Sequence, residues 1–388
     1  MSFQRLAPLP IMLAALILFT GKVWADTWQQ SGSARVSTEY DTNPARTTVN
    51  PEGVWRYVAE PSYTLTGNFD RNVLRTGLAL QLARSSNESL SPNRNSPTAF
   101  LDWVRQNEAG EFGISSRYAE TSTRNINTGT TGTTGTTGTT GTTGTTGTTD
   151  PALADSTRAS RTLSGRWNNA LSERSTLAAN GSYESVSYSG GTLTNYATRS
   201  AGMMYSYLWS EASTPFLRVI RTDYEPAIST TPSNFSNTVL AGLNWTASEA
   251  LSGTLQAGQS KVSNADKASM QGGGSVRYNA ERTQLSLSAN RSVTPSGLGG
   301  FATVDQVNGS WSYALSEHRS AGIDLGWQKS KLITDITNST SGVWLQHALN
   351  SFWGVRTYYR HNTLSRVGIN DATSDILGIA LTYTHTDF

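Results

Sequence analysis

A short motif returns along the chain and limits what the chain can fold into. Ser or Ala followed by Glu, close to an aromatic side chain, occurs in "NALSERST" at 169–176, "YLWSEAST" at 207–214, "WTASEALS" at 245–252 and "YALSEHRS" at 313–320, with "YNAERTQ" at 278–284 as a variant. The motif glutamates, spaced 32 to 38 residues apart, are Glu173, Glu211, Glu249, Glu281 and Glu317. A regular period of this length indicates serially repeated supersecondary units.

The segments beside the motif decide between helical and strand repeats. After Glu317, the apolar residues Ile323, Leu325 and Trp327 alternate with Asp324 and Gly326. A period of two is typical of a strand, whereas a helix places apolar residues three and four positions apart. Each repeat is therefore predicted to be a β-hairpin, and the Ser-Glu motif marks one of its ends.

Composition narrows the choice of β-architecture. Only 36% of the residues are hydrophobic, yet the chain carries 11 Trp and 15 Tyr, so it is not typical of a disordered chain. A wide transmembrane barrel explains both facts, because its outer face is apolar and its lumen polar, with no packed core. The alternative is a secreted β-solenoid, which would not need aromatic rims. The small net charge of +2 gives no reason to expect a nucleic-acid partner.

The first 25 residues have the features of a secretory signal. A basic residue, Arg5, precedes the apolar run "IMLAALILF", and "VWA" ends at Ala25 with small or aliphatic residues at the cleavage positions. We predict a signal peptide at 1–25 and an outer-membrane β-barrel at 26–388. The expected partners of the barrel are outer-membrane lipid and the barrel-assembly machinery.

Reading the alternating segments one by one gives an all-β, antiparallel transmembrane barrel of about eighteen strands, with sixteen as the alternative. The Ser-Glu turns are short and are predicted to be periplasmic, whereas the other connections are rich in Pro, Gly and Asn and are predicted to be long outer loops. "TPSGLGG", for example, is predicted to be a loop between strands at 283–293 and 301–315. The last two strands are predicted at 353–363 and 375–387.

Tryptophans accompany the short turns. Amphipathic rings prefer the headgroup level of a membrane, so a Trp beside each turn predicts a periplasmic girdle. The residues concerned are Trp103, Trp167, Trp209, Trp245, Trp311 and Trp353. One outer loop, 125–157, contains seven copies of "GTT" at 129–149, a composition that can bury almost no surface.

Sequence motifs for chemistry are absent. The four histidines form no metal-ligand pair at helical spacing, and no G-x-S-x-G is present. Glu39, Asp41 and Asn43 in "EYDTNP" alternate in a way that could suit calcium, but an Asn-Pro turn explains them more simply. We therefore expect no enzyme activity, no metal site and no cofactor.

Arginine dominates the predicted lumen face. Arg outnumbers Lys in this chain, and guanidinium groups make forked contacts with anions. By alternation, the arginines opposite the apolar stripe are Arg56, Arg75, Arg117, Arg166, Arg277, Arg356 and Arg360. The acids predicted on the same face are Glu60, Asp102, Glu184 and Asp324. The arginines are candidate substrate-binding residues of an anion-preferring pore; alternatively, they pair with the acids and brace the wall.

The N-terminal third resembles a known family. "EYDTNP" at 39–44, "PEGVWRYVAEP" at 51–61, "LARSSNESLSPNRNSPTAFLDW" at 82–103 and "GEFGISSRY" at 110–118 are similar to outer-membrane β-barrel porins associated with exopolysaccharide export and exosortase (PEP-CTERM) loci of Gram-negative bacteria. The C-terminus also resembles an outer-membrane assembly signal, although Phe388 falls on the face opposite Leu381 and Tyr383.

The resemblance implies a passive pore or accessory channel for export of an anionic exopolysaccharide, working with periplasmic export components. A structural or surface-interaction barrel without transport activity is the alternative. The resemblance supplies no catalytic residues.

Overall fold

The computed structural model describes residues 27–123, 156–190, 193–228, 232–331 and 335–385. The predicted signal peptide at 1–25, nearly all of the predicted loop at 125–157 and the C-terminal Phe388 lie outside the described residues, so these predictions stay predictions. Within the described part of the chain, no helix has the length and apolarity needed to cross a membrane.

Eighteen strands form the described structure. They are β1 (Thr27–Asp41), β2 (Val54–Phe69), β3 (Asn72–Ser85), β4 (Arg94–Gln106), β5 (Gly110–Ser122), β6 (Thr157–Ala170), β7 (Ser175–Ser189), β8 (Tyr196–Tyr207), β9 (Ser213–Pro226), β10 (Asn234–Thr246), β11 (Leu251–Val262), β12 (Ser269–Asn279), β13 (Thr283–Ser296), β14 (Gly300–Ser316), β15 (Arg319–Lys331), β16 (Asp335–Ala348), β17 (Trp353–Arg366) and β18 (Ile369–His385).

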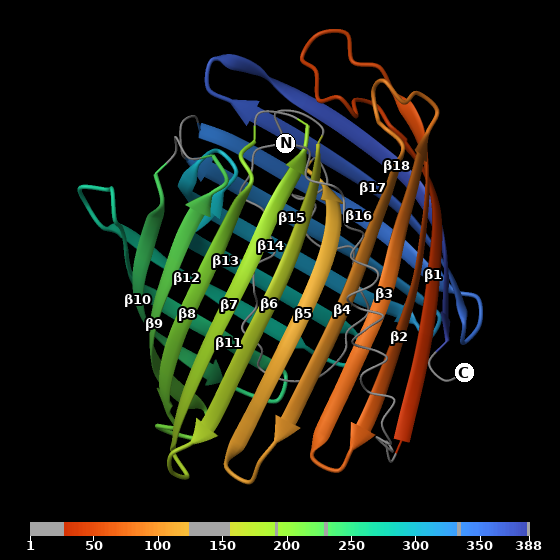
Figure 1. The fold of residues 1–388 in the computed structure, drawn as a ribbon. Coiled ribbons are helices and arrows are strands. Elements are labelled where there is room, and N and C mark those ends of the chain that lie inside the picture. Colours follow the sequence, from red (N-terminus) through yellow and green to blue (C-terminus); the bar gives the residue numbers. More distant parts are fainter. Residues whose placement is uncertain (1–26, 124–155, 191–192, 229–231, 332–334, 386–388) are drawn as a thin grey trace, which may run out of the picture.

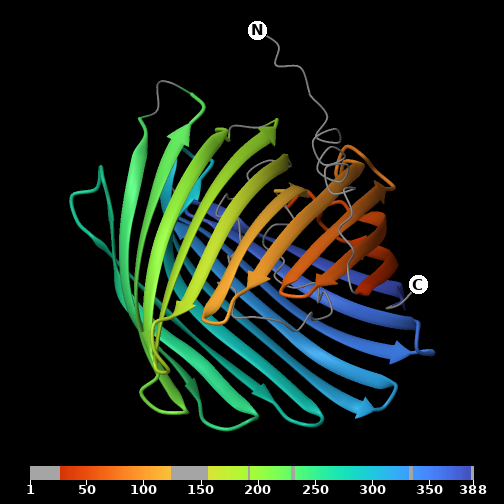
Figure 2. The same cartoon turned by 60° about the horizontal axis from the view of Figure 1, so that its bottom comes forward.

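The strands close into a barrel. Each strand pairs antiparallel with the next along the chain, and β18 returns to β1 in a register that runs from Gly32 opposite His385 to Asp41 opposite Ile376. Figures 1 and 2 show the tilted strands arranged in a ring. Closure pairs the backbone groups that an open sheet edge would leave unsatisfied. The prediction of an eighteen-stranded antiparallel barrel is confirmed, and the solenoid alternative is wrong.

Side chains alternate between the two faces of the wall. On β15, Ile323, Leu325 and Trp327 project outward, and Leu325 is 56% exposed, while Asp324 projects into the lumen. The same alternation leaves Leu78, Leu255 and many other large apolar side chains exposed around the outside. So extensive an apolar surface is stable against lipid rather than against water.

This outward surface, here named the apolar belt, is bounded at both ends. We call the end with the short Ser-Glu turns the turn end and the opposite end the loop end. Near the turn end lie the predicted girdle residues Trp103, Trp167, Trp209, Trp245, Trp311 and Trp353. Toward the loop end, outward ion pairs begin: Arg221–Asp223, Arg291–Asp305 and Lys329–Asp335.

Two loop-end connections are shorter than predicted. β13 and β14 are joined by residues 297–299 alone, and Pro295 still pairs with Phe301 inside the hairpin. β17 and β18 are joined by Val367 and Gly368. Gly299 and Gly368 have φ values of 98° and 81°, a backbone region that favours glycine and permits tight turns. The predicted strand limits at 293, 363 and 375 were therefore wrong, because breaker residues lie within the hairpins rather than in long loops.

Candidate functional site

The lumen surface divides into two unlike walls. The charged wall consists of the inner faces of β15–β18 and β1–β7. Its charged side chains, assigned by alternation, include Arg35, Arg56, Arg75, Arg117, Arg158, Arg166, Arg356 and Arg360 with Glu39, Asp41, Glu60, Asp102, Glu111, Glu184 and Asp324. The neutral wall, the inner face of β8–β14, carries mostly Ser, Thr, Asn, Gln and Gly; its charged residues within these strands are Arg218 and Arg277.

The shortest ion pair of the charged wall lies near the loop end. Arg56 Nη2 is 2.8 Å from Glu39 Oε1, and the Tyr358 hydroxyl donates to Glu39 Oε2 at 3.0 Å. Glu39 is only 7% exposed. Because a buried carboxylate needs compensating partners, this three-residue contact joins β1, β2 and β17 at the seam where the barrel closes.

Other predicted arginines also lie beside acids. Arg166 Nε is 3.1 Å from Glu111 Oε1, and Arg356 Nη2 is 3.6 Å from Asp324 Oδ2 while its guanidinium lies 4.2 Å from the Trp344 ring centroid. An arginine side chain that contacts both an acid and an aromatic ring has little rotational freedom left to turn toward a solute in the lumen.

Asp102 is the centre of a second group. It is the cross-strand neighbour of Arg75 and interacts electrostatically with Arg75, Arg117 and Arg166. Arg75 also lies over the Phe100 ring, 5.3 Å from its centroid. Because Arg166 also contacts Glu111, two carboxylates serve three guanidinium groups, which leaves this region of the wall with positive charge.

Arg360 and Arg277 complete the predicted set. Arg360 lies over the Tyr358 ring at 5.8 Å and interacts with Asp324. Arg277 is exposed on the neutral wall, between the cross-strand neighbours Ser252 and Ser286. The structure thus brings six of the seven arginines to one wall and leaves Arg277 apart. Ion pairs with acids favour the bracing interpretation for Arg56, Arg166 and Arg356, and substrate binding stays a prediction.

Sequence reasoning missed several charged-wall residues. Arg35 lies 3.7 Å from Glu60, and Arg158 lies 2.9 Å from Glu184. Glu111 could have been found, because it precedes the outward Phe112 and so must face the lumen. Arg158 directly follows the low-complexity loop. No alternating residues precede it, so the sequence did not show which face of the wall Arg158 occupies.

A hairpin narrows the lumen at the loop end. Residues 296–301, here named the mouth hairpin, contact β7–β9, although β10–β12 separate β9 from β13 in the order of the sheet. The Tyr224 hydroxyl donates to the Ser296 carbonyl at 3.1 Å, and Thr194 N donates to the Gly297 carbonyl at 2.6 Å. Phe301 packs on Tyr224 with ring centroids 5.9 Å apart.

The surface that receives the mouth hairpin is a small apolar core inside the lumen. Val186, Tyr196 and Tyr224 are at most 5% exposed, and Tyr188 and Phe301 pack against them. Arg158 donates a hydrogen bond to Tyr196. Buried aromatic contacts of this kind hold the hairpin in one position and reduce the open area of the mouth.

The β1–β2 loop is held against β18 by hydrogen bonds. Asn43 Nδ2 donates to the carbonyls of Thr47 (2.8 Å) and Thr373 (2.9 Å), and Asn43 N donates to Asp41 Oδ1 at 3.0 Å. Ser374 donates to the same Asp41 oxygen at 2.6 Å. These oxygens already accept hydrogen bonds from groups of the protein. The Asn-Pro turn therefore explains the alternating polar residues without calcium. Among the described residues, no cluster of His, Asp and Glu could hold a metal ion.

A closed antiparallel barrel with an apolar outside and a polar inside defines the class of outer-membrane β-barrels. A solved outer-membrane protein, OpdK, has a similar fold. Pseudomonas aeruginosa OpdK matches 94% of this chain and 100% of its own, with 10% identity and a TM-score of 0.50. P. aeruginosa OccK3 (OpdO) matches 93% and 96%, with 11% identity and a TM-score of 0.48. Identities this low show the shared fold alone. No family model and no curated protein matches the chain.

Proposed function

We propose that this chain is an outer-membrane pore that passes a hydrophilic solute without chemistry in the lumen. The observation that carries the proposal is the lumen surface itself. A packed, apolar interior would support a purely structural barrel, whereas this interior carries charged groups on one side and hydroxyl and amide groups on the other. Such a surface stabilises water and hydrated solutes.

The orientation follows the lengths of the connections. The Ser-Glu turns face the periplasm, together with the N-terminal end of β1, and the longer loops face the outside. Lipid surrounds the apolar belt, and the barrel-assembly machinery inserts the chain after a signal peptide has taken it across the inner membrane.

The solute we propose is an anionic exopolysaccharide, delivered by periplasmic export components. Support comes from the sequence resemblance described above and from the excess of arginines over acids on the two walls. That excess is small, because most arginines have an acidic neighbour, so the expected preference for anions is modest.

A second candidate function is a structural barrel without transport. The observation that favours it is the mouth hairpin, whose aromatic contacts reduce the opening at the loop end.

Single-channel recording in a planar bilayer tests the proposal. The pore proposal expects stepwise conductance from the purified, folded protein and concentration-dependent blockade by an anionic oligosaccharide such as oligogalacturonate. A matched neutral oligosaccharide should block less. Folded protein that inserts but never conducts would contradict the pore and leave the structural function.

A further inference from the structure

An outward-facing arginine ends the apolar column of β3. Leu78, Leu80 and Leu82 occupy alternate positions on the outer face of this strand, and Arg84 is the next residue in the series. Arg84 is exposed, and its direct cross-strand neighbour on β2 is Tyr57, whose side chain is 53% exposed. Directly opposed residues lie on one face of a sheet, and Figure 1 shows β2, β3 and β4 side by side. Arg84 therefore lies on the outside of the barrel, at the loop-end limit of the apolar belt.

Neutral oxygens hold the Arg84 guanidinium in place. Nη1 donates to the carbonyls of Ala83 at 2.8 Å and Arg94 at 3.1 Å. Nη1 and Nη2 both donate to Asn95 Oδ1, each at 3.0 Å. A guanidinium has five N–H donors, so Nε–H and the second hydrogen of Nη2 have no acceptor among the described residues. The group is fixed, and it keeps a fork of two parallel donors for a ligand.

The charge of Arg84 is not neutralised by the part of the wall that the structure describes, where no acid forms an ion pair with it. Another outward arginine at the loop end, Arg291, contacts Asp305 at 2.6 Å. Glu88, the acid of the loop after β3, accepts a hydrogen bond from Asn93 Nδ2 at 2.5 Å instead of pairing with Arg84. A guanidinium that is fixed by neutral groups and has no acid of its own favours an anionic ligand.

A hollow of about 220 Å³ gives a ligand access to this guanidinium. Its lining residues, here named the Arg84 site, are Arg84, Asn93, Arg94 and Asn95. A second arginine and two asparagines therefore border the same space. Residues of these types suit a phosphate group, whose several oxygens accept forked contacts from arginine and single hydrogen bonds from amides.

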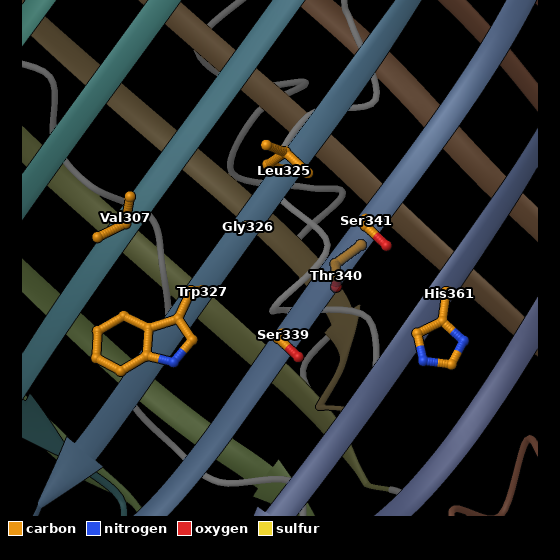
Figure 3. Close-up of a pocket in the computed structure, with 8 residues that line it drawn as sticks. All are labelled: Val307, Leu325, Gly326, Trp327, Ser339, Thr340, Ser341 and His361. Carbon is orange, nitrogen blue, oxygen red and sulfur yellow. The ribbon is translucent and has the colours of Figure 1, made fainter.

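A second hollow, on the opposite part of the chain, shows what distinguishes the Arg84 site. This hollow of about 290 Å³ lies beside Leu325, Trp327, Ser341 and His361 (Figure 3). None of its lining residues is an arginine or a lysine, and the His361 imidazole already contacts Asp375 Oδ1 at 2.8 Å. It offers apolar surface and hydroxyl groups to a ligand, but no unpaired guanidinium.

The position of Arg84 relative to the apolar belt selects the kind of anion. Trp55 and Tyr57 are exposed on β2, and rings of this kind lie at the headgroup level of a membrane. Leu82 and Leu80 lie on the belt side of Arg84, where acyl chains cover the barrel. A molecule that contacts this whole stretch needs acyl chains and, at one end, a negatively charged group. A phosphate-bearing membrane lipid has both, whereas a soluble anion has only the second.

We propose that the Arg84 site binds the phosphate group of a lipid in the leaflet at the loop end of the barrel. The free fork of Nε–H and Nη2–H donates to two phosphate oxygens, and Asn93 and Arg94 border the headgroup. The acyl chains lie along Leu82 and Leu80. The site does not involve the lumen, so the proposal holds whether or not the barrel conducts.

Native mass spectrometry of the full chain, released from detergent micelles, tests the site during titration with dioleoyl phosphatidic acid. For the first bound lipid, Arg84→Gln should raise the dissociation constant about tenfold, because it removes charge-assisted hydrogen bonds. Arg84→Lys keeps the charge but loses the fork, so it should restore only part of the affinity. Dioleoylglycerol, which has the same chains and no phosphate, should bind more weakly than phosphatidic acid by about tenfold or more.

Arg291→Gln is the matched control, because Arg291 is also an outward arginine at the loop end but is paired with Asp305. Its affinity for phosphatidic acid should equal that of the wild type, and heat-modifiable migration on a denaturing gel shows that each variant is folded. Equal affinity in the wild type and Arg84→Gln would overturn the proposal, as would an equal loss in Arg291→Gln. Displacement of the lipid by glycerol 3-phosphate or inorganic phosphate would overturn the lipid assignment and indicate a site for soluble anions.

Discussion

The charged wall and the neutral wall are built on the same backbone but are stabilised differently. On the charged wall, Glu39, Arg56 and Tyr358 connect three strands through buried polar contacts at the seam. On the neutral wall, the contacts are hydrogen bonds between uncharged hydroxyl groups, such as Ser236 with Ser260 at 2.6 Å. The comparison teaches that ion pairs which brace the seam neutralise part of the positive charge of the charged wall.

The largest expected effect comes from breaking the seam. Glu39→Ala leaves the Arg56 guanidinium buried without its carboxylate, and breaking a buried ion pair from one side costs about 3–5 kcal/mol. We expect the free energy of unfolding to fall by that amount in urea titrations of protein folded into liposomes. On the neutral wall, Ser286→Ala serves as the control, and an equal loss there would remove the distinction between the two walls.

A smaller effect is expected at the mouth hairpin. Tyr224→Phe keeps the ring but removes the hydrogen bond to Ser296, a contribution of about 1 kcal/mol. The hairpin should then leave its position about five times more often, since 1 kcal/mol changes an equilibrium by roughly that factor. Single-channel recordings should show more frequent openings to a larger conductance. Unchanged recordings would mean that the hairpin does not limit the pore.

The smallest effect on stability is expected at Arg277. This arginine is exposed on the neutral wall, and no acid among the described residues forms an ion pair with it. Arg277→Gln should change the free energy of unfolding by no more than about 0.5 kcal/mol. A loss as large as that of Glu39→Ala would show that the neutral wall also depends on ionic contacts.

The sequence of each strand, taken alone, was enough to predict the barrel, because apolar and polar residues alternate within every strand. Ile323, Leu325 and Trp327 identify the outer face of β15 without knowledge of any other strand. The same rule assigned the seven arginines to the lumen. It also indicated Glu60, Asp102, Glu184 and Asp324 as acids, and Arg356, Arg158 and Arg35 are found beside three of them.

Contacts between distant segments could not be predicted in this way. Tyr224 and Ser296 are 72 residues apart, and nothing in "TPSGLGG" distinguishes a loop from a hairpin that reaches β9. Pro295 is tolerated there because the end of the hairpin has only one pairing partner. His361 and Asp375 are joined only when the tight turn at Val367 and Gly368 sets the register of β17 and β18.

The reversal potential in a salt gradient is the most direct test of a pore with a net cationic lumen. We expect wild-type protein to prefer anions modestly. Arg356→Gln combined with Arg360→Gln should move the potential toward zero, while heat-modifiable migration shows that the barrel still assembles. A cation preference, or an anion preference unchanged by these substitutions, would contradict the assignment of selectivity to the charged wall.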